Sequence, residues 1–85
     1  MFNGIIFNKG TIDGIKKRAK GVNLFIKSSL KVSNKNLGIS ISCDGVCLTL
    51  ISCKNKTLEF YLSNETLAKS KFRNIKIGDE INLEK

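Results

Sequence analysis

One short turn constrains the fold of this chain more than any other feature. Asp44 and Gly45 separate two runs in which apolar and polar residues alternate, "SISC" at 40–43 and "VCLTLISC" at 46–53. An Asp-Gly pair between such runs favours the type I′ turn of a β-hairpin. Successive side chains of a strand point to opposite faces, so Cys47 and Leu48 should lie on different sides of the sheet. The segment therefore predicts two antiparallel strands joined by a tight turn.

The same alternation recurs along most of the chain and indicates about six strands in all. Beyond the hairpin, strands are expected at 2–7, 22–29, 57–63 and 77–84. The segment 10–17 follows the first of these, with Gly10 and Gly14 as bends or bulges.

One helix is predicted after the strand that ends at residue 63. It covers 64–72 ("NETLAKSKF"), with Ser63 or Asn64 as the N-cap. Short strands separated by frequent turns are typical of a small antiparallel barrel or sandwich. A closed barrel is favoured, because closure removes the exposed strand edges that a small sheet cannot otherwise protect.

Length and composition exclude several classes of protein. The chain has 85 residues, which suffices for one domain. No apolar run approaches the roughly 20 residues that a membrane-spanning helix requires. The N-terminus lacks the basic and apolar pattern of a secretion signal. We therefore expect a soluble cytoplasmic protein that has no membrane partner.

The net charge of +8 raises the question of a nucleic-acid partner. The chain has 13 Lys but only 2 Arg, and apart from "KKRAK" at 16–20 the basic residues are scattered. Recognition of bases and phosphates relies strongly on the guanidinium fork of Arg. The charge therefore does not favour nucleic-acid binding.

The reactive side chains do not form a complete catalytic group. The sequence has no His, which excludes Ser-His and Cys-His pairs. Its three cysteines, Cys43, Cys47 and Cys53, are odd in number and match no common zinc spacing. We expect three reduced thiols and no bound metal.

Two interpretations of the strand at 46–51 stay open on the pattern alone. Both faces could be buried, with Cys47 acting as a small hydrophobic residue. Alternatively, Cys47 and Thr49 belong to a polar stripe that binds a flat ligand rich in heteroatoms.

Four sequence blocks carry a resemblance to a known family. "MFNGII", "GISISCDGVCLT", "NETLAKS" and "IGDEINLE" occur in this order and together cover nearly the whole chain. They resemble the lumazine-binding domain that forms the N-terminal half of riboflavin synthases. The chain departs from the family pattern at Asn3, Ile39, Cys43, Asp44, Tyr61, Ser63, Asn64 and Ser70.

The resemblance implies an all-β fold, a six-stranded antiparallel Greek-key closed barrel with one or two short helices. It also implies a longer protein with two such barrels in tandem, assembled as a trimer. On this basis residues 1–85 form a single lumazine-binding barrel, and the second barrel is absent from this chain. We expect the isolated barrel to form a homodimer, because the surface that would face a sister barrel is left uncovered.

The implied activity is the dismutation of two molecules of 6,7-dimethyl-8-ribityllumazine. The products are riboflavin and 5-amino-6-ribitylaminouracil, and neither a metal nor an organic cofactor is implied. In the family the second barrel supplies a His, which this chain lacks. The chain is therefore expected to bind ligand but to catalyse the reaction very slowly or not at all.

The resemblance also assigns site residues. Phe2, Ser40 and Cys47 are the expected catalytic contacts. The wider set that would bind lumazine or riboflavin comprises Gly4, Ile5, Ile6, Ser40, Cys47, Leu48, Thr49, Tyr61, Leu62, Ser63, Asn64, Glu65 and Thr66. Within this set, residues 61–66 would hold the pyrimidine edge and the ribityl chain.

Two other functions remain as alternatives. The first is a non-catalytic lumazine or flavin carrier of the same fold. The second is a small oligonucleotide-binding barrel, which would need exposed aromatic residues beside basic ones. Phe25 and Tyr61 are the candidates for such a surface, and they lie far apart in the sequence.

Overall fold

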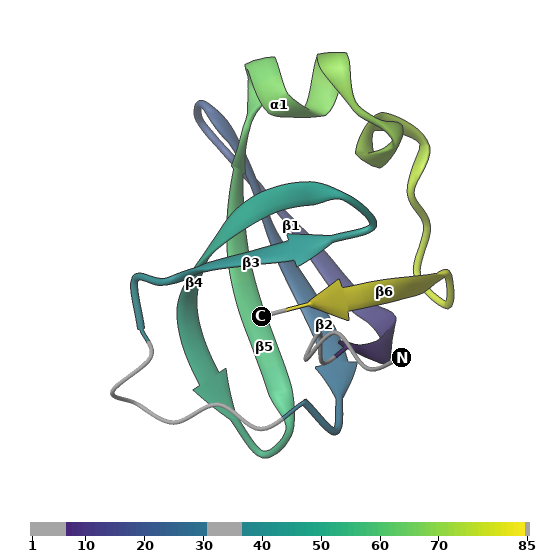
Figure 1. Cartoon of the computed structure of the whole chain (residues 1–85). Helices are drawn as coiled ribbons and strands as arrows, with labels where there is room; N and C mark the ends of the chain where they lie inside the picture. Colours follow the sequence, from purple (N-terminus) through teal and green to yellow (C-terminus); the bar gives the residue numbers. More distant parts are fainter. Residues whose placement is uncertain (1–6, 31–36, 85) are drawn as a thin grey trace.

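The computed structural model describes residues 7–30 and 37–84 of the chain. These residues form the strands β1 (Phe7–Arg18), β2 (Gly21–Ser28), β3 (Ser40–Cys43), β4 (Val46–Lys54), β5 (Thr57–Ser63) and β6 (Glu80–Glu84). A short helix, α1 (Asn64–Lys69), and a 3₁₀ turn, η2 (Lys71–Asn74), connect β5 to β6 (Figure 1). Among the described residues, no helix is long and apolar enough to cross a membrane.

The strands close into a barrel in the order β1-β2-β5-β4-β3-β6, and every neighbouring pair is antiparallel. β3, β4 and β5 follow one another as hairpins, and β6 returns by a longer connection to lie beside β3. This is the Greek-key arrangement. The predicted all-β barrel is therefore confirmed.

The barrel interior is filled by apolar side chains from every strand. Leu24 and Ile26 of β2, and Leu58 and Phe60 of β5, are buried on the faces that the alternation predicts. Burying one such side chain contributes about 1.5–3 kcal/mol to stability. The alternation thus determines which face of each strand packs into the core and which face lies on the outer surface, where a binding site can form.

The first strand differs from its prediction. Residues 2–6 of the strand expected at 2–7 lie outside the described residues. β1 runs without a break from Phe7 through Gly10 and Gly14, with a register shift between Ile12 and Gly14 that confirms a bulge there. Gly10 is not a bend: a Cβ on it would collide with Ile26 and approach Leu83 Cδ1 to 3.1 Å. Close packing against side chains of the neighbouring strands β2 and β6 explains this glycine.

The predicted Asp-Gly turn is confirmed, and a second tight turn follows β4. Asp44 and Gly45 have φ values of 51° and 87° and connect β3 to β4. Asn55 and Lys56 have φ values of 51° and 65° and connect β4 to β5. Positive φ at both central residues is what a type I′ turn requires, and its twist matches that of the flanking strands.

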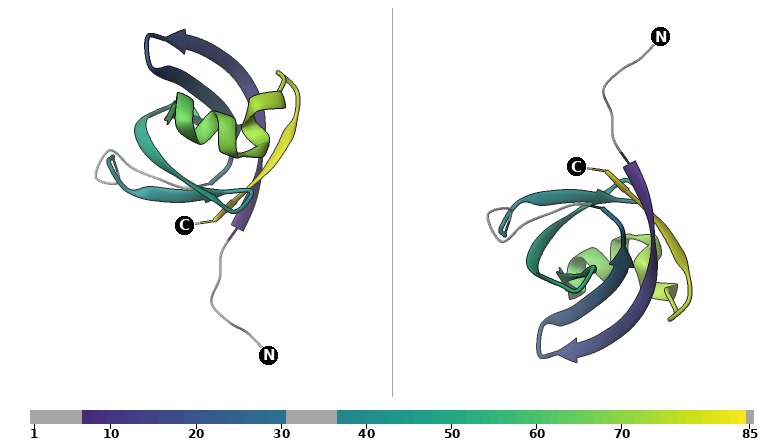
Figure 2. Two further views of the ribbon diagram at one scale, coloured as in Figure 1. Left: turned by 90° about the horizontal axis from the view of Figure 1, so that it is seen from above. Right: turned by 90° about the horizontal axis from the view of Figure 1, so that it is seen from below.

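The helical segment lies across one end of the barrel (Figure 2). Ser63 is its N-cap: the Oγ atom accepts a hydrogen bond of 3.2 Å from the backbone N–H of Thr66. Ser70 ends α1 and caps η2, accepting a hydrogen bond of 3.2 Å from the N–H of Phe72. Phe72 is buried and anchors the segment to the core.

Candidate functional site

A row of polar side chains crosses the outer face of the barrel. Ser40 on β3 pairs with Thr49 on β4, and Thr49 pairs with Tyr61 on β5. Directly paired residues on neighbouring strands point to the same side of the sheet. Ser40 and Thr49 are exposed, whereas Ile41 and Leu48 beside them point inward and are buried. The register therefore brings two of the expected hydroxyls together on the surface.

Cys47 extends this face toward the helix. It lies two residues before Thr49 on β4 and is exposed. The interpretation in which Cys47 is a buried hydrophobic residue is therefore wrong. Its thiol and the Thr49 hydroxyl lie on the same outer face, since their spacing along the strand is two residues.

An open groove separates the start of β4 from α1. Its volume is about 490 Å³, within the range of roughly 300–1,000 Å³ typical of small-molecule sites. One wall consists of Gly45, Val46 and Cys47, and the other of Glu65, Thr66, Lys69 and Ser70. Three of the expected site residues, Cys47, Glu65 and Thr66, meet here although they come from distant parts of the sequence.

The groove offers hydrogen-bonding groups without bulky side chains on the β4 wall. The Cys47 thiol is a weak donor, and the Glu65 carboxylate accepts hydrogen bonds when ionised. Glu65 Oε2 lies 3.2 Å from Lys69 Nζ in an exposed pair along the helix. The Thr66 hydroxyl accepts a hydrogen bond of 3.1 Å from Ser63. A flat polar molecule could therefore rest on β4 with its edge toward α1.

Tyr61 is not directed into the groove. Its hydroxyl donates a hydrogen bond of 3.0 Å to the backbone carbonyl of Lys20. The side chain therefore leans over β2, where a Cβ on Gly21 would approach the Tyr61 hydroxyl oxygen to 2.9 Å. Although Tyr61 pairs with Thr49 along the backbone, its phenol points toward the opposite neighbour.

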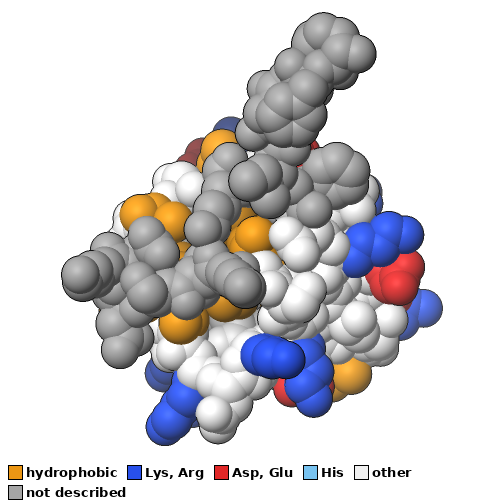
Figure 3. All heavy atoms as spheres, turned by 60° about the horizontal axis from the view of Figure 1, so that its bottom comes forward, with side chains coloured by type: hydrophobic (Ala, Val, Ile, Leu, Met, Phe, Trp, Pro, Cys, Tyr) orange, Lys and Arg blue, Asp and Glu red, His pale blue; other side chains and the backbone are white. Residues whose placement is uncertain are grey.

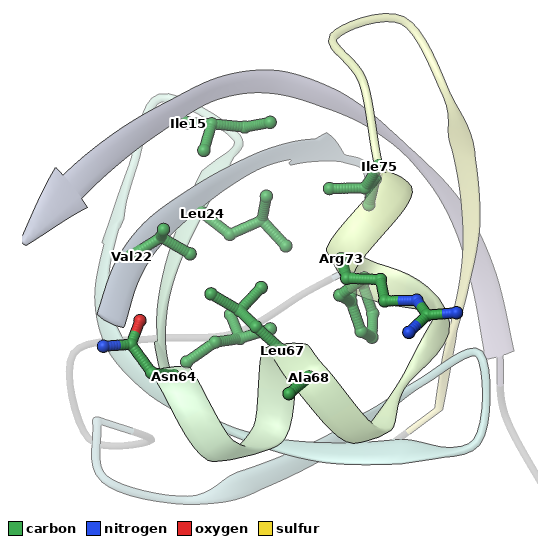
Figure 4. Close-up of a pocket in the computed structure, with 10 residues that line it drawn as sticks. Ile15, Val22, Leu24, Asn64, Leu67, Ala68, Arg73 and Ile75 are labelled. Carbon is green, nitrogen blue, oxygen red and sulfur yellow. The ribbon is translucent and has the colours of Figure 1, made fainter. Parts of the chain in front are cut away.

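Three further expected residues lie apart from the groove. Leu48 and Leu62 are buried, so their side chains belong to the core. Leu62 and Asn64 line a different hollow of about 350 Å³, beneath α1 and largely apolar. Figure 4 shows Leu67 of α1 facing Val22 and Leu24 across this hollow. Phe2, Gly4, Ile5 and Ile6 lie outside the described residues.

Sequence reasoning missed four residues that line the groove. Gly45 is the second residue of the predicted turn and Val46 follows it, and Lys69 and Ser70 follow Glu65 and Thr66 by four positions each. Positions four apart share a helix face, so the last two could have been found from helical spacing. Which face of the helix meets β4 depends on tertiary packing and is not encoded in that spacing.

Burial and charge set Cys43 and Asp44 apart from the groove residues. Burial, followed by the nearby Asp44 and Cys47, raises the pKa of the Cys43 thiol to about 12. Partial burial alone would raise the pKa of Asp44, but the Asn82 N–H and the Lys71 ammonium outweigh it and lower this pKa. Cys43 therefore stays a thiol at neutral pH, and Asp44 stays ionised.

The surface charges do not gather into a nucleic-acid site on the face shown in Figure 3. Lys and Arg side chains are scattered there, with acidic side chains among them. Phe25 is partly buried, and the Tyr61 hydroxyl is bonded to the Lys20 carbonyl. In the described part of the chain, no cluster of three or more His, Cys, Asp or Glu could hold a metal ion.

A comparison with family models shows to which protein family this chain belongs. The family model described as the lumazine binding domain matches residues 3–85. The chain belongs to the lumazine-binding domain family. The resemblance seen in the four sequence blocks is thereby confirmed.

Several curated proteins are similar to this lumazine-binding domain. Riboflavin synthase of Chlamydia pneumoniae is 39% identical over 85 residues, which cover 99% of this chain and 42% of that protein. Riboflavin synthase of Photobacterium leiognathi is 36% identical, covering 100% and 39% respectively. Riboflavin synthase of Bacillus subtilis (strain 168) is 33% identical, covering 100% and 40%. The chain thus spans about two fifths of the length of these relatives.

Proposed function

We propose that this chain binds 6,7-dimethyl-8-ribityllumazine and riboflavin in the groove between β4 and α1. The observation that carries this proposal is the meeting of Cys47, Glu65 and Thr66 in one open groove, in a chain that belongs to the lumazine-binding domain family. Exposed Ser40 and Thr49 continue the same face.

The chemistry of the groove suits a flat ring with a polyhydroxylated chain. On this proposal the ring rests on the outer face of β4, where the Cys47 thiol and the Thr49 hydroxyl reach its nitrogens and carbonyl oxygens. The Glu65 carboxylate accepts hydrogen bonds from the ribityl hydroxyls. The groove is open on one side, which leaves the outer face of the ring available to a second ring.

We further propose that this groove is one half of a riboflavin synthase site. The reaction joins two lumazine rings, so the protein must orient both and assist proton transfer. Ser40 and Cys47 would contact the reacting ring. Neither a metal nor an organic cofactor enters this proposal, because the electron-poor ring of the substrate itself stabilises the charge that develops.

The lack of His favours a second candidate, a non-catalytic lumazine or flavin carrier. A carrier needs the ring site but no general base. Both functions use the same groove, so they differ in turnover and not in the location of binding.

Self-association is part of the proposal. The N–H of Gly38 donates a hydrogen bond of 2.7 Å to the Leu50 carbonyl, so the chain that follows Leu37 runs along β4. Leu37 is 44% and Ile51 41% exposed, and a second copy related by two-fold symmetry would cover such side chains. Sedimentation at about tens of micromolar protein should show a homodimer; a single monomeric species would contradict this.

The ring site is tested by titrating riboflavin and following the quenching of its fluorescence. The unmodified chain should bind, and Thr49→Val should weaken binding by about 1–3 kcal/mol, because a ligand polar group loses its partner. Thr11→Val makes the same change at an exposed strand position on β1 and serves as the control. Absence of riboflavin binding would overturn the proposal, and an unchanged affinity of Thr49→Val would remove Thr49 from the site.

A further inference from the structure

The carboxylate of Asp44 joins three elements of the barrel. Its Oδ1 atom accepts a hydrogen bond of 2.8 Å from the backbone N–H of Asn82 on β6. Its Oδ2 atom accepts one of 2.9 Å from Lys71 Nζ on η2. The backbone N–H of Asp44 donates to the Asn82 carbonyl, also at 2.8 Å. One turn residue thus connects the β3–β4 hairpin, the last strand and the helical segment.

These contacts extend the shortest strand pairing of the barrel, which joins β3 to β6. β3 and β6 share only the pairs Ser42–Glu84 and Cys43–Leu83 among the described residues. The bonds between Asp44 and Asn82 continue this short ladder by one more position. The Asp44 side chain is 12% exposed and the Lys71 side chain 62%, so water reaches the ion pair from the lysine side and added salt should weaken it.

The ion pair also lies at the junction of the two groove walls. Asp44 directly precedes Gly45, the first residue of the β4 wall, and Lys71 directly follows Ser70, the last residue of the α1 wall. The turn and the helical segment come from separate parts of the chain and meet at this end (Figure 1). A contact between Asp44 and Lys71 therefore ties one wall to the other.

The other ion pairs of the described residues do not join the walls. Lys69 and Glu65 belong to the same helix, and both lie on the α1 wall. Lys9 and Glu80 connect β1 to β6, are 4.0 Å apart and are about 70% exposed on each side. The contact between Asp44 and Lys71 is thus the one of the three whose loss would change how the walls are held.

We propose that Asp44 and Lys71 form a clasp that fixes the spacing of the two groove walls, and that both are positioning residues for the ring. The role in ring binding rests on the function proposed above, whereas the holding of the walls does not. Without the clasp the walls sample wider arrangements, and only the fraction with the correct spacing is competent to bind. The apparent affinity falls by that fraction.

Hydrogen exchange of backbone amides tests the clasp without any ligand. Lys71→Met should accelerate exchange at 45–47 and 69–71 and leave the core amides of β5 unchanged. Lys9→Met removes the same charge from the other inter-strand pair and should leave both walls as they are. Lys71→Arg keeps the charge and should restore slow exchange. Unchanged exchange at both walls in Lys71→Met would overturn the proposal.

Riboflavin titration tests the consequence for the ring. Lys71→Met should raise the dissociation constant about three- to tenfold, and Lys71→Arg should restore the affinity. Asp44→Asn keeps an acceptor for the Asn82 N–H but removes the charge, so it should reproduce Lys71→Met. Riboflavin carries no net charge, so added salt acts on the ion pair between Asp44 and Lys71 and not on an attraction between the protein and the ligand. Salt should therefore weaken binding to the unmodified chain and to Lys9→Met, but not to Lys71→Met.

The outcomes separate the two proposals. If the unmodified chain does not bind riboflavin, the proposed function falls, and amide exchange alone decides whether the clasp holds the walls. If the chain binds riboflavin and Lys71→Met binds it equally well, Asp44 and Lys71 are not positioning residues. Faster exchange together with weaker, salt-insensitive binding in Lys71→Met would support the complete proposal.

Discussion

Cys43 and Cys47 lie four residues apart and have opposite surroundings. The Asp44–Gly45 turn reverses the chain between them, so that Cys43 points into the core and Cys47 onto the outer face. Burial raises the pKa of Cys43 to about 12, and its thiol donates to the Ile41 carbonyl at 3.6 Å. Since the thiolate is the reactive form, the two residues should differ strongly in reactivity.

We predict that iodoacetamide modifies Cys47 of the folded chain at least about tenfold faster than Cys43. Peptide mass measurement over time would follow both sites, and the unfolded, reduced chain provides the control. After unfolding without reductant, all three cysteines should be modified. Equal rates at Cys43 and Cys47, or fewer than three adducts, would contradict this.

At the scale of elements, the hairpin around Asp44–Gly45 could be predicted almost completely from the sequence. Turn chemistry and alternation are local, and together they determine the register that places Ser40 beside Thr49. The extent of β1 could not be predicted, because Gly10 serves close packing against Ile26 and not a bend. The resemblance supplied three of the residues that line the groove, Cys47, Glu65 and Thr66. It did not supply how α1 lies over β4, which depends on contacts such as that of Phe72 with the core.

The same limit explains why Tyr61, Leu62 and Asn64 lie apart from the groove. The resemblance assigned them to one site with Glu65, but strand alternation turns Leu62 inward, and the Tyr61 hydroxyl bonds to the Lys20 carbonyl on the side of β2. Asn64 begins the helix on the side of the apolar hollow. Their roles toward a ligand stay predictions.

Ser63 caps α1, the helix that forms one wall of the groove, and substitutions at Ser63 measure what this cap contributes to stability. Ser63→Ala should lower the free energy of unfolding by about 1 kcal/mol, because the N–H of Thr66 loses its acceptor. Ser63→Asp, which also caps helices well, should recover most of this loss. Urea denaturation measures both variants. Ser52→Ala on β4 is the control, with an expected change within about 0.5 kcal/mol; an equal effect of Ser52→Ala would contradict a capping role.

At the scale of the whole molecule, the barrel is complete but the proposed site faces outward. The six strands close on themselves, whereas the groove lies outside and covers one face of a ring at most. The chain spans about two fifths of the riboflavin synthases that it resembles. A second ring would therefore need a partner surface. That surface would also have to supply proton-transfer groups, because this chain has no His.

We predict that the purified chain forms riboflavin from 6,7-dimethyl-8-ribityllumazine very slowly or not at all. A positioned general base contributes about 10²–10⁴-fold, and misplacement of the two rings would cost more. Riboflavin absorbance would follow the reaction, and a full-length riboflavin synthase is the control. Addition of its C-terminal half in trans should raise the rate. Turnover by the chain alone at the rate of the full-length enzyme would contradict the half-site account.

The central claim is that the groove between β4 and α1 holds the ring. Backbone amide chemical shifts of the labelled chain, recorded during titration with riboflavin, locate the site directly. The account predicts that the largest shifts occur at 45–49 and 65–70, on both walls of the groove. Shifts concentrated instead around the apolar hollow beneath α1, at Val22, Leu24 and Phe72, would contradict it.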